Sequence, residues 1–188
     1  MLNLDPIWTP DIQQAHFRLL LDAMARPGLC KPVTTLPESG PVVLAILATL
    51  LDGEVSLSDP DKLLRDEDWL MLQVKTAPVE HANYILCDGK HAPDFIPSLG
   101  TLPSPDQSAT LILVVDAIGD IQGAGDTQLR LSGPGIAHSN RICIKGLHQQ
   151  WLDKREGWVG AFPLGVDFIL LDNRQMLALP RTTKVEII

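Results

Sequence analysis

The amino-acid sequence predicts an α/β fold, a three-layer α/β/α sandwich built around a mixed sheet. Two continuous apolar runs, residues 111–115 and 166–171, are typical of strands that are covered on both faces. Segments with the apolar spacing of helices alternate with these runs, as expected of a sheet with helices on its faces. The chain has 188 residues, of which 45% are hydrophobic, and this suits one domain, residues 1–188, with a sizeable core.

Three helices are expected. The first starts at Thr9, which can cap it, and ends at the Pro27-Gly28 pair. The second covers residues 41–51, where apolar residues face nearly all directions, so it should be buried. The third covers residues 147–158, with its tryptophans near one stripe, whereas residues 69–75 are ambiguous between helix and strand.

Three shorter runs are predicted to be strands that pair beside the two apolar runs. They are residues 84–87, 128–132 and 176–179. No stretch of the chain is long enough to look like an interdomain linker, which again favours a single domain.

Composition excludes several classes of partner and compartment. The formal net charge of −8 argues against nucleic acid, because neutralising phosphates needs a basic surface. The longest apolar stretch, residues 42–51, is too short to span a bilayer, so no membrane insertion is expected. Asp5 and Pro6 stand where a secretory signal would need basic and apolar residues. Three dispersed cysteines fit a reducing compartment, and a cytoplasmic protein is predicted.

A polar cluster, Arg181-Thr182-Thr183, follows the predicted strand 176–179 and Pro180 near the end of the chain. A guanidinium has forked donors that match two phosphate or phosphonate oxygens, and two hydroxyls can add hydrogen bonds. The cluster can therefore be an anion-binding site or an anchor for a partner protein. The alternative is a structural role, in which Arg181 pairs with a local carboxylate.

Asp167 is the best candidate for that carboxylate. It lies inside the almost unbroken apolar run 166–171, so burial would force it to pair or to take up a proton. Arg181 or Arg130 can supply the positive charge. Structural pairing is favoured here over work as a general base.

The turn Ser132-Gly133-Pro134-Gly135 is the second candidate for an anion site. Its glycines permit positive φ and close backbone approach, so its amides could cradle an anion, although a plain turn is the safer interpretation without the lysine of a P-loop.

A metal site is not expected. His81, Cys87 and His91 match no common zinc spacing and lack a fourth ligand.

Four blocks of the sequence, in this order, resemble one protein family. They are Ala15-His16-Phe17-Arg18 with the helix end 23–28, then 50–53, then 129–136, and finally 162–171 with 178–186. The blocks are similar to those of the H subunit (PhnH) family of the bacterial carbon–phosphorus (C–P) lyase system for phosphonate use. Arg18, in the first block, joins the candidates for an anion-binding or interface site.

The resemblance implies a fold related to the large domain of pyridoxal-phosphate-dependent transferases, without their cofactor. No pyridoxal phosphate is expected, because none of the lysines stands in a recognisable Schiff-base context. No iron–sulfur cluster is expected either, because the cysteines lack the necessary spacing.

The resemblance also implies an accessory subunit of an enzyme complex. In that family the subunit works with the G, I and L subunits to convert ATP and an alkylphosphonate into ribose 1-alkylphosphonate 5-triphosphate, and the J subunit cleaves the C–P bond. The isolated chain is expected to be a homodimer. The alternatives are a self-contained anion-binding protein or enzyme with a pocket around Arg181, and a metal-dependent hydrolase.

Overall fold

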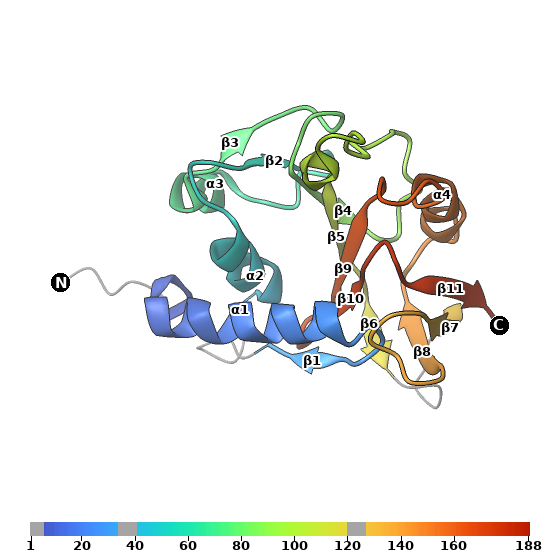
Figure 1. Cartoon of the computed structure of the whole chain (residues 1–188). Helices are drawn as coiled ribbons and strands as arrows, with labels where there is room; N and C mark the ends of the chain where they lie inside the picture. Colours follow the sequence, from blue (N-terminus) through green and yellow to red (C-terminus); the bar gives the residue numbers. More distant parts are fainter. Residues whose placement is uncertain (1–5, 34–40, 120–126) are drawn as a thin grey trace.

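The computed structural model describes residues 6–33, 41–119 and 127–188, and a seven-stranded mixed sheet forms its centre (Figure 1). Its strands, in spatial order, are β1 (Lys31–Pro32), β10 (Gln175–Leu179), β9 (Asp167–Leu171), β5 (Thr110–Val114), β4 (Tyr84–Asp88), β2 (Ser56–Ser58) and β3 (Lys75–Thr76). The strands from β9 to β3 are parallel, whereas β10 runs antiparallel to β9 and β1 runs antiparallel to β10. The two apolar runs are confirmed as β5 and β9, which are adjacent, with Leu111 opposite Phe168.

A second, smaller sheet is antiparallel throughout. Its strands, in spatial order, are β11 (Lys184–Ile187), β7 (Thr127–Ser132), β8 (Asn140–Lys145) and β6 (Ala117–Gly119). Residues 128–132 were predicted to pair beside the apolar runs, and this is wrong, because β7 pairs with β8 and β11 instead. In β7 the buried Leu129 and Leu131 alternate with the more exposed Gln128 and Arg130, a pattern typical of a sheet with one buried face.

Four α-helices and two short 3-10 helices complete the described part of the chain. They are η1 (Pro6–Trp8), α1 (Pro10–Ala25), α2 (Val42–Leu50), α3 (Asp66–Leu72), η2 (Pro105–Gln107) and α4 (Gln150–Trp158). The three predicted helices are confirmed as α1, α2 and α4, but the prediction that the side chain of Thr9 caps α1 is wrong, because its hydroxyl donates to the carbonyl oxygen of Pro6 at 2.7 Å instead. Residues 69–75, which were ambiguous between helix and strand, contain the end of one and the start of the other. The helix α3 ends at Leu72, Gln73 adopts a φ of 52°, and the strand β3 begins at Lys75. Over the described ranges, no helix is both long and apolar enough to cross a membrane.

The large sheet buries both of its faces. On one face, Leu86 and Ile112 pack with residues of α1 and α2. On the other face, Leu111 and Phe168 pack with Trp151 of α4 and with the second sheet. A mixed α/β fold on a mixed sheet is thus confirmed. The layer beside α4 contains a sheet as well as a helix, a composition that the sequence did not predict.

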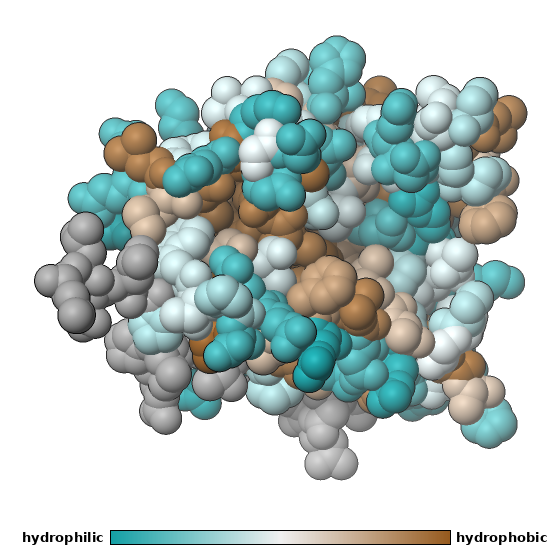
Figure 2. Space-filling view, turned by 60° about the vertical axis from the view of Figure 1, so that its left-hand side comes forward, coloured by the Kyte–Doolittle hydropathy of each residue, from teal (hydrophilic) through white to brown (hydrophobic). Residues whose placement is uncertain are grey.

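The cluster Arg181-Thr182-Thr183 lies at the other end of the molecule from α2 and α3, whereas Arg18 is on α1 and Gly135 packs against Ala25 at the end of α1. Those three helices are on the side turned forward in Figure 2, where apolar side chains gather in the middle of the face with hydrophilic ones around them. Exposed apolar residues of α1 and α3 include Phe17, Leu21, Leu70 and Met71. The helix α4 and the C-terminal strand β11 lie at the opposite end of the molecule (Figure 1).

Candidate functional site

A cleft of about 770 Å³ lies between α4, the turn after β10, and β11. Its described lining consists of Pro134, Leu152, Asp153, Arg155, Glu156, Val159, Phe162 and residues 181–187. The volume falls within the usual range of ligand sites, roughly 300–1,000 Å³. The structure therefore places the predicted cluster Arg181-Thr182-Thr183 at a cavity.

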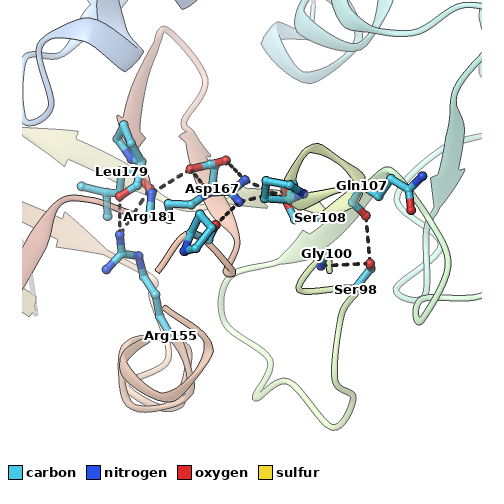
Figure 3. A network of polar contacts seen from close by, with 11 residues as sticks. Ser98, Gly100, Gln107, Ser108, Arg155, Asp167, Leu179 and Arg181 are labelled. Atoms are coloured by element: carbon cyan, nitrogen blue, oxygen red, sulfur yellow. Dashed lines mark hydrogen bonds and ion pairs between the residues drawn. The ribbon is translucent and has the colours of Figure 1, made fainter. Parts of the chain in front are cut away.

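The guanidinium of Arg181 is engaged by groups of the chain itself (Figure 3). Its Nε and Nη2 atoms lie 3.4 and 2.6 Å from the two carboxylate oxygens of Asp167. Nη2 also donates to Oγ of Ser108 at 2.5 Å, and Nη1 donates to the carbonyl oxygens of Pro105 and Pro163 at 3.2 and 3.1 Å. A guanidinium has five N–H donors, so these contacts use all of them.

Asp167 and Arg181 thus form the ion pair that the sequence left open as the structural alternative. Both side chains are largely buried, at 16% and 17% exposed. The main-chain N–H of Arg181 donates to the same carboxylate at 2.7 Å. Arg181 therefore has no donor left for an anion while this pair is closed. Arg130, the other cation considered, pairs with Glu186 at 3.3 Å.

A second arginine, Arg155 of α4, is part of the wall of the cleft. It was not predicted as a site residue. It is 3% exposed. Its Nη1 donates to the carbonyl oxygen of Thr183 at 3.2 Å, and its Nη2 donates to those of Pro180 and Leu179 at 2.6 and 3.5 Å. The guanidinium carbon lies 5.6 Å from the ring centre of Phe168, within cation–π range. No described carboxylate forms an ion pair with it.

Burial lowers the pKa of Arg155 to about 10, and the negative charge of Asp167 acts in the opposite direction. Three carbonyl oxygens thus replace the water that would solvate this cation. The sequence contained a signal for it. Arg155 follows Trp151 by four residues and precedes Trp158 by three, so it falls on the apolar stripe of the helix. A charge on such a stripe indicates a buried ion.

The two hydroxyls of the cluster have different surroundings. Thr182 is exposed, whereas Thr183 is 2% exposed and its Oγ1 has no hydrogen-bond partner among the described residues. The N–H of Thr183 donates to the carbonyl oxygen of Pro180 at 2.9 Å and closes the turn between β10 and β11. Thr182 alone presents its hydroxyl to solvent, so the cluster is not a continuous row of free donors.

The turn Gly133-Pro134-Gly135 connects separate parts of the chain. Both glycines have positive φ, 125° and 81°. A Cβ atom on Gly133 would lie 2.9 Å from the carbonyl oxygen of Thr182, and one on Gly135 would lie 2.1 Å from that of Ala25. Ser132 precedes the turn, opposite Lys184. The turn therefore packs between the end of α1 and the polar cluster, with Pro134 at the cleft.

The remaining candidates do not gather at the cleft. Arg18 is exposed on α1 and is not part of the lining. His91 lies 3.3 Å from Asp61, and Cys87 is buried, which raises the pKa of its thiol. No three His, Cys, Asp or Glu residues within the described ranges are grouped so that they could hold a metal ion.

Comparison with known proteins assigns the chain to a family. Residues 7–186 match the family described as "Bacterial phosphonate metabolism protein (PhnH)". Over 181 residues the chain is 37% identical to "Putative C-P lyase subunit protein HtxG" of Stutzerimonas stutzeri, with 96% of this chain and 89% of the relative covered. Over 204 residues it is 31% identical to "Alpha-D-ribose 1-methylphosphonate 5-triphosphate synthase subunit PhnH" of Rhizobium meliloti (strain 1021), with 97% and 92% covered. These matches confirm the resemblance found in the sequence, and the chain belongs to the PhnH family of bacterial phosphonate metabolism proteins.

Proposed function

We propose that this chain is the H-type subunit of a C–P lyase core complex that serves phosphonate catabolism. It acts with G, I and L subunits in a transferase reaction that makes ribose 1-alkylphosphonate 5-triphosphate from ATP and an alkylphosphonate. The observation that carries the proposal is the identity of 37% to HtxG over 96% of the chain. The second relative is named as a subunit of the synthase that makes the methylphosphonate form of this product.

The chemistry of the cleft supports an accessory role. Its described lining contains no histidine and no cysteine. Arg181, the cation that the sequence singled out, is neutralised by Asp167. None of the described hydroxyl or amine groups of the lining is hydrogen-bonded to a carboxylate, as an activated nucleophile would be. On this proposal the J subunit cleaves the C–P bond, and this chain uses neither pyridoxal phosphate nor an iron–sulfur cluster.

The proposal includes finer properties that were expected from the composition and pattern of the sequence and from the family resemblance. These are a cytoplasmic location, a three-layer fold related to the large domain of pyridoxal-phosphate-dependent transferases, and a homodimer when the chain is isolated. The exposed apolar residues Phe17 and Leu21 of α1 are compatible with association. Light scattering at micromolar concentration should give twice the mass of one chain, and a monomer would contradict the dimer.

Co-expression with G, I, J and L subunits tests the proposed function. We expect this chain to co-purify with them, and the purified set to convert ATP and methylphosphonate into the triphosphate product, followed by phosphorus NMR. Leaving out this chain should abolish the product, and adding it back should restore it. Full product formation by the other subunits alone would refute the proposal.

A self-contained anion-binding protein or enzyme is the second candidate. The observation that favours it is the volume of the cleft, with the buried cation Arg155 in its wall. This candidate predicts that the purified chain binds or turns over ATP or methylphosphonate without partners. An accessory subunit predicts neither, so calorimetric titration of the isolated chain with each compound separates the two.

A further inference from the structure

The strand β11 has a free edge. One side pairs with β7, where Lys184 lies opposite Ser132 and Ile187 opposite Leu129. In the described sheet no strand pairs with its other side. All of β11 lines the cleft, so the cavity borders this free edge. An unpaired edge beside a cavity is a place where another polypeptide can add a strand.

The hydrogen-bond register identifies the backbone groups that face the cleft. The N–H of Ile188 donates to the carbonyl oxygen of Gln128 at 2.9 Å, which makes these two residues a bonded pair. Bonded and non-bonded pairs alternate along an antiparallel ladder. The N–H and C=O groups of Val185 and Ile187 therefore point away from β7. No described residue forms a hydrogen bond with any of these four groups.

Thr183, two residues before Val185, shows that this edge can accept hydrogen bonds. The carbonyl oxygen of Thr183 points in the same direction as those of Val185 and Ile187, and it accepts a hydrogen bond from Nη1 of Arg155. Arg155 thus takes the place that the first donor of an added strand would have. The row of open groups begins directly after it.

The shape of the cleft limits what can enter. α4 and β11 lie at the same end of the molecule (Figure 1), and the lining of the cleft between them includes Leu152, Asp153, Arg155 and Glu156 of α4 and Val159 directly after it. A single extended segment can lie between a strand edge and a helix. The edge of a second sheet cannot, because its further strands would run into α4. A single peptide strand therefore fits better than the sheet of a second copy of this chain.

The side chains around the cleft define the chemistry of that segment. Phe162 and Ile187 are 72% and 49% exposed, and they offer apolar contacts. Asp153 and Glu156 are exposed carboxylates, and neither forms an ion pair with a described residue. Lys184 is the exposed cation of the lining, since the two arginines are held by internal hydrogen bonds. Glu186, the third carboxylate of the lining, pairs with Arg130, so the α4 side of the rim is acidic, the β11 side carries Lys184, and the walls are largely apolar.

We propose that the cleft receives one extended segment of another subunit, which adds to β11 as a strand and carries apolar residues alternating with lysine or arginine. Its backbone bonds to Val185 and Ile187, and its basic side chains pair with Asp153 and Glu156. This inference rests on the proposed function, because it requires the chain to be part of a complex.

A pair of proline variants tests the added strand. Ile187→Pro removes an N–H that faces the cleft, whereas Ile188→Pro removes the N–H that bonds to Gln128 of the chain's own sheet. We expect Ile187→Pro to weaken retention of the co-expressed G, I, J and L subunits by about tenfold or more, and Ile188→Pro to retain them. Equal melting temperatures of the two variants show that a loss is not due to unfolding.

Charge reversal tests the partner's chemistry. Asp153→Lys with Glu156→Lys should release the other subunits, whereas Glu80→Lys, at an exposed carboxylate outside the lining, should not. In the wild-type complex, amide exchange at Val185 and Ile187 should slow by about tenfold or more on assembly.

The outcomes separate this inference from the proposed function. Failure of the wild-type chain to bind the other subunits overturns both. If the wild type binds them but the proline and charge variants bind equally well, or exchange at Val185 and Ile187 is unchanged, only the docking site is overturned. Dissociation of an isolated homodimer by Ile187→Pro, with the complex intact, would make a second copy the occupant and also refute this inference.

Discussion

The Nη2 atom of Arg181 lies 2.6 Å from Oδ2 of Asp167, and the main-chain N–H of Arg181 lies 2.7 Å from Oδ1 of the same carboxylate. These contacts connect the start of β9 to the turn that follows β10. The same guanidinium donates to Ser108 and to the carbonyl oxygen of Pro105, which precede β5. One side chain thus holds together three segments at one end of the large sheet, so its first role is internal.

Replacing Arg181 with alanine should therefore lower stability. The change leaves a largely buried carboxylate at Asp167 without its counterion, and breaking such a pair costs about 3–5 kcal/mol. Urea unfolding of Arg181→Ala and of the wild type measures this difference in the free energy of unfolding. Arg181→Lys keeps the positive charge but loses the forked donors of the guanidinium, so its free energy of unfolding should lie between those of the wild type and Arg181→Ala.

A double-mutant cycle separates the ion pair from the other contacts of Arg181. The losses caused by Arg181→Ala and Asp167→Asn should not add, because each variant removes the same pair. Additive losses would mean that the pair contributes little. Unchanged unfolding of Arg181→Ala, with loss of the other subunits, would instead assign Arg181 to an anion or a partner.

The central strands could be predicted from the sequence because a strand that is buried on both faces consists of a continuous run of apolar residues. The position of Arg181-Thr182-Thr183 at a cavity followed from its place after a strand-ending proline. The second sheet could not be predicted in the same way. Its strand β11 is half polar, and its neighbour β7 is far away in the chain, so local pattern carries no information about this pairing.

Arg155, in the wall of the cleft, was not predicted as a site residue, because its burial also depends on residues that are far away in the chain. Arg155 falls on the apolar stripe of α4, which is a signal of burial, but charged residues of helices are exposed in most proteins, and this one signal did not outweigh that expectation. Only the distant carbonyl oxygens of Leu179, Pro180 and Thr183 make its burial possible. The sequence places them in another segment, and no short motif connects the two.

Two glycines should respond to alanine in opposite ways. Gly135 has a φ of 81°, and a Cβ atom there would lie 2.1 Å from the carbonyl oxygen of Ala25. Gly135→Ala should therefore destabilise the protein by more than about 1–2 kcal/mol, since neither atom can move without shifting backbone. Gly157, within α4, has open space around it, and Gly157→Ala should stabilise by about 0.5–1 kcal/mol. Thermal unfolding measures both, and a loss at Gly157 as large as at Gly135 would contradict the backbone argument.

Two aspartates that follow strands should also differ. Asp172, after β9, is 6% exposed and accepts hydrogen bonds from the N–H groups of Ile118, Arg174 and Gln175 at 2.9, 2.8 and 2.9 Å. Asp172→Ala leaves a buried donor unpaired between the two sheets and should cost about 1–3 kcal/mol or more.

The matched control is Asp116, which follows β5 and pairs with Lys90 at 2.7 Å, with side chains 40% and 53% exposed. Asp116→Ala should cost less than about 1 kcal/mol, because exposed ion pairs contribute little. Chemical unfolding of both variants gives the comparison. Equal losses would show that the hydrogen bonds of Asp172 do not hold the sheets together.

The buried guanidinium of Arg155 should make stability depend on alkaline pH. Burial lowers its pKa from the ordinary value of a guanidinium to about 10, so the folded chain releases this proton before the unfolded chain does. Below about pH 10 both states are charged, and the full cost of burying the cation is present. Above about pH 10 the unfolded state binds more protons than the folded state. The free energy of unfolding therefore rises by up to about 1.4 kcal/mol for each pH unit, until Arg155 also loses its proton in the unfolded state.

The comparison of wild type with Arg155→Met isolates this effect, because methionine is of similar length and does not titrate. The difference in the free energy of unfolding should be constant from about pH 7 to pH 9 and should shift in favour of the wild type between about pH 9.5 and pH 11. Arg141→Met, which removes an exposed guanidinium of β8, controls for the general loss of a positive charge. If the difference in the free energy of unfolding between the wild type and Arg155→Met stays constant up to pH 11, Arg155 is solvated in the folded chain. Water would then reach the cleft around α4 more than the contacts of Arg155 indicate.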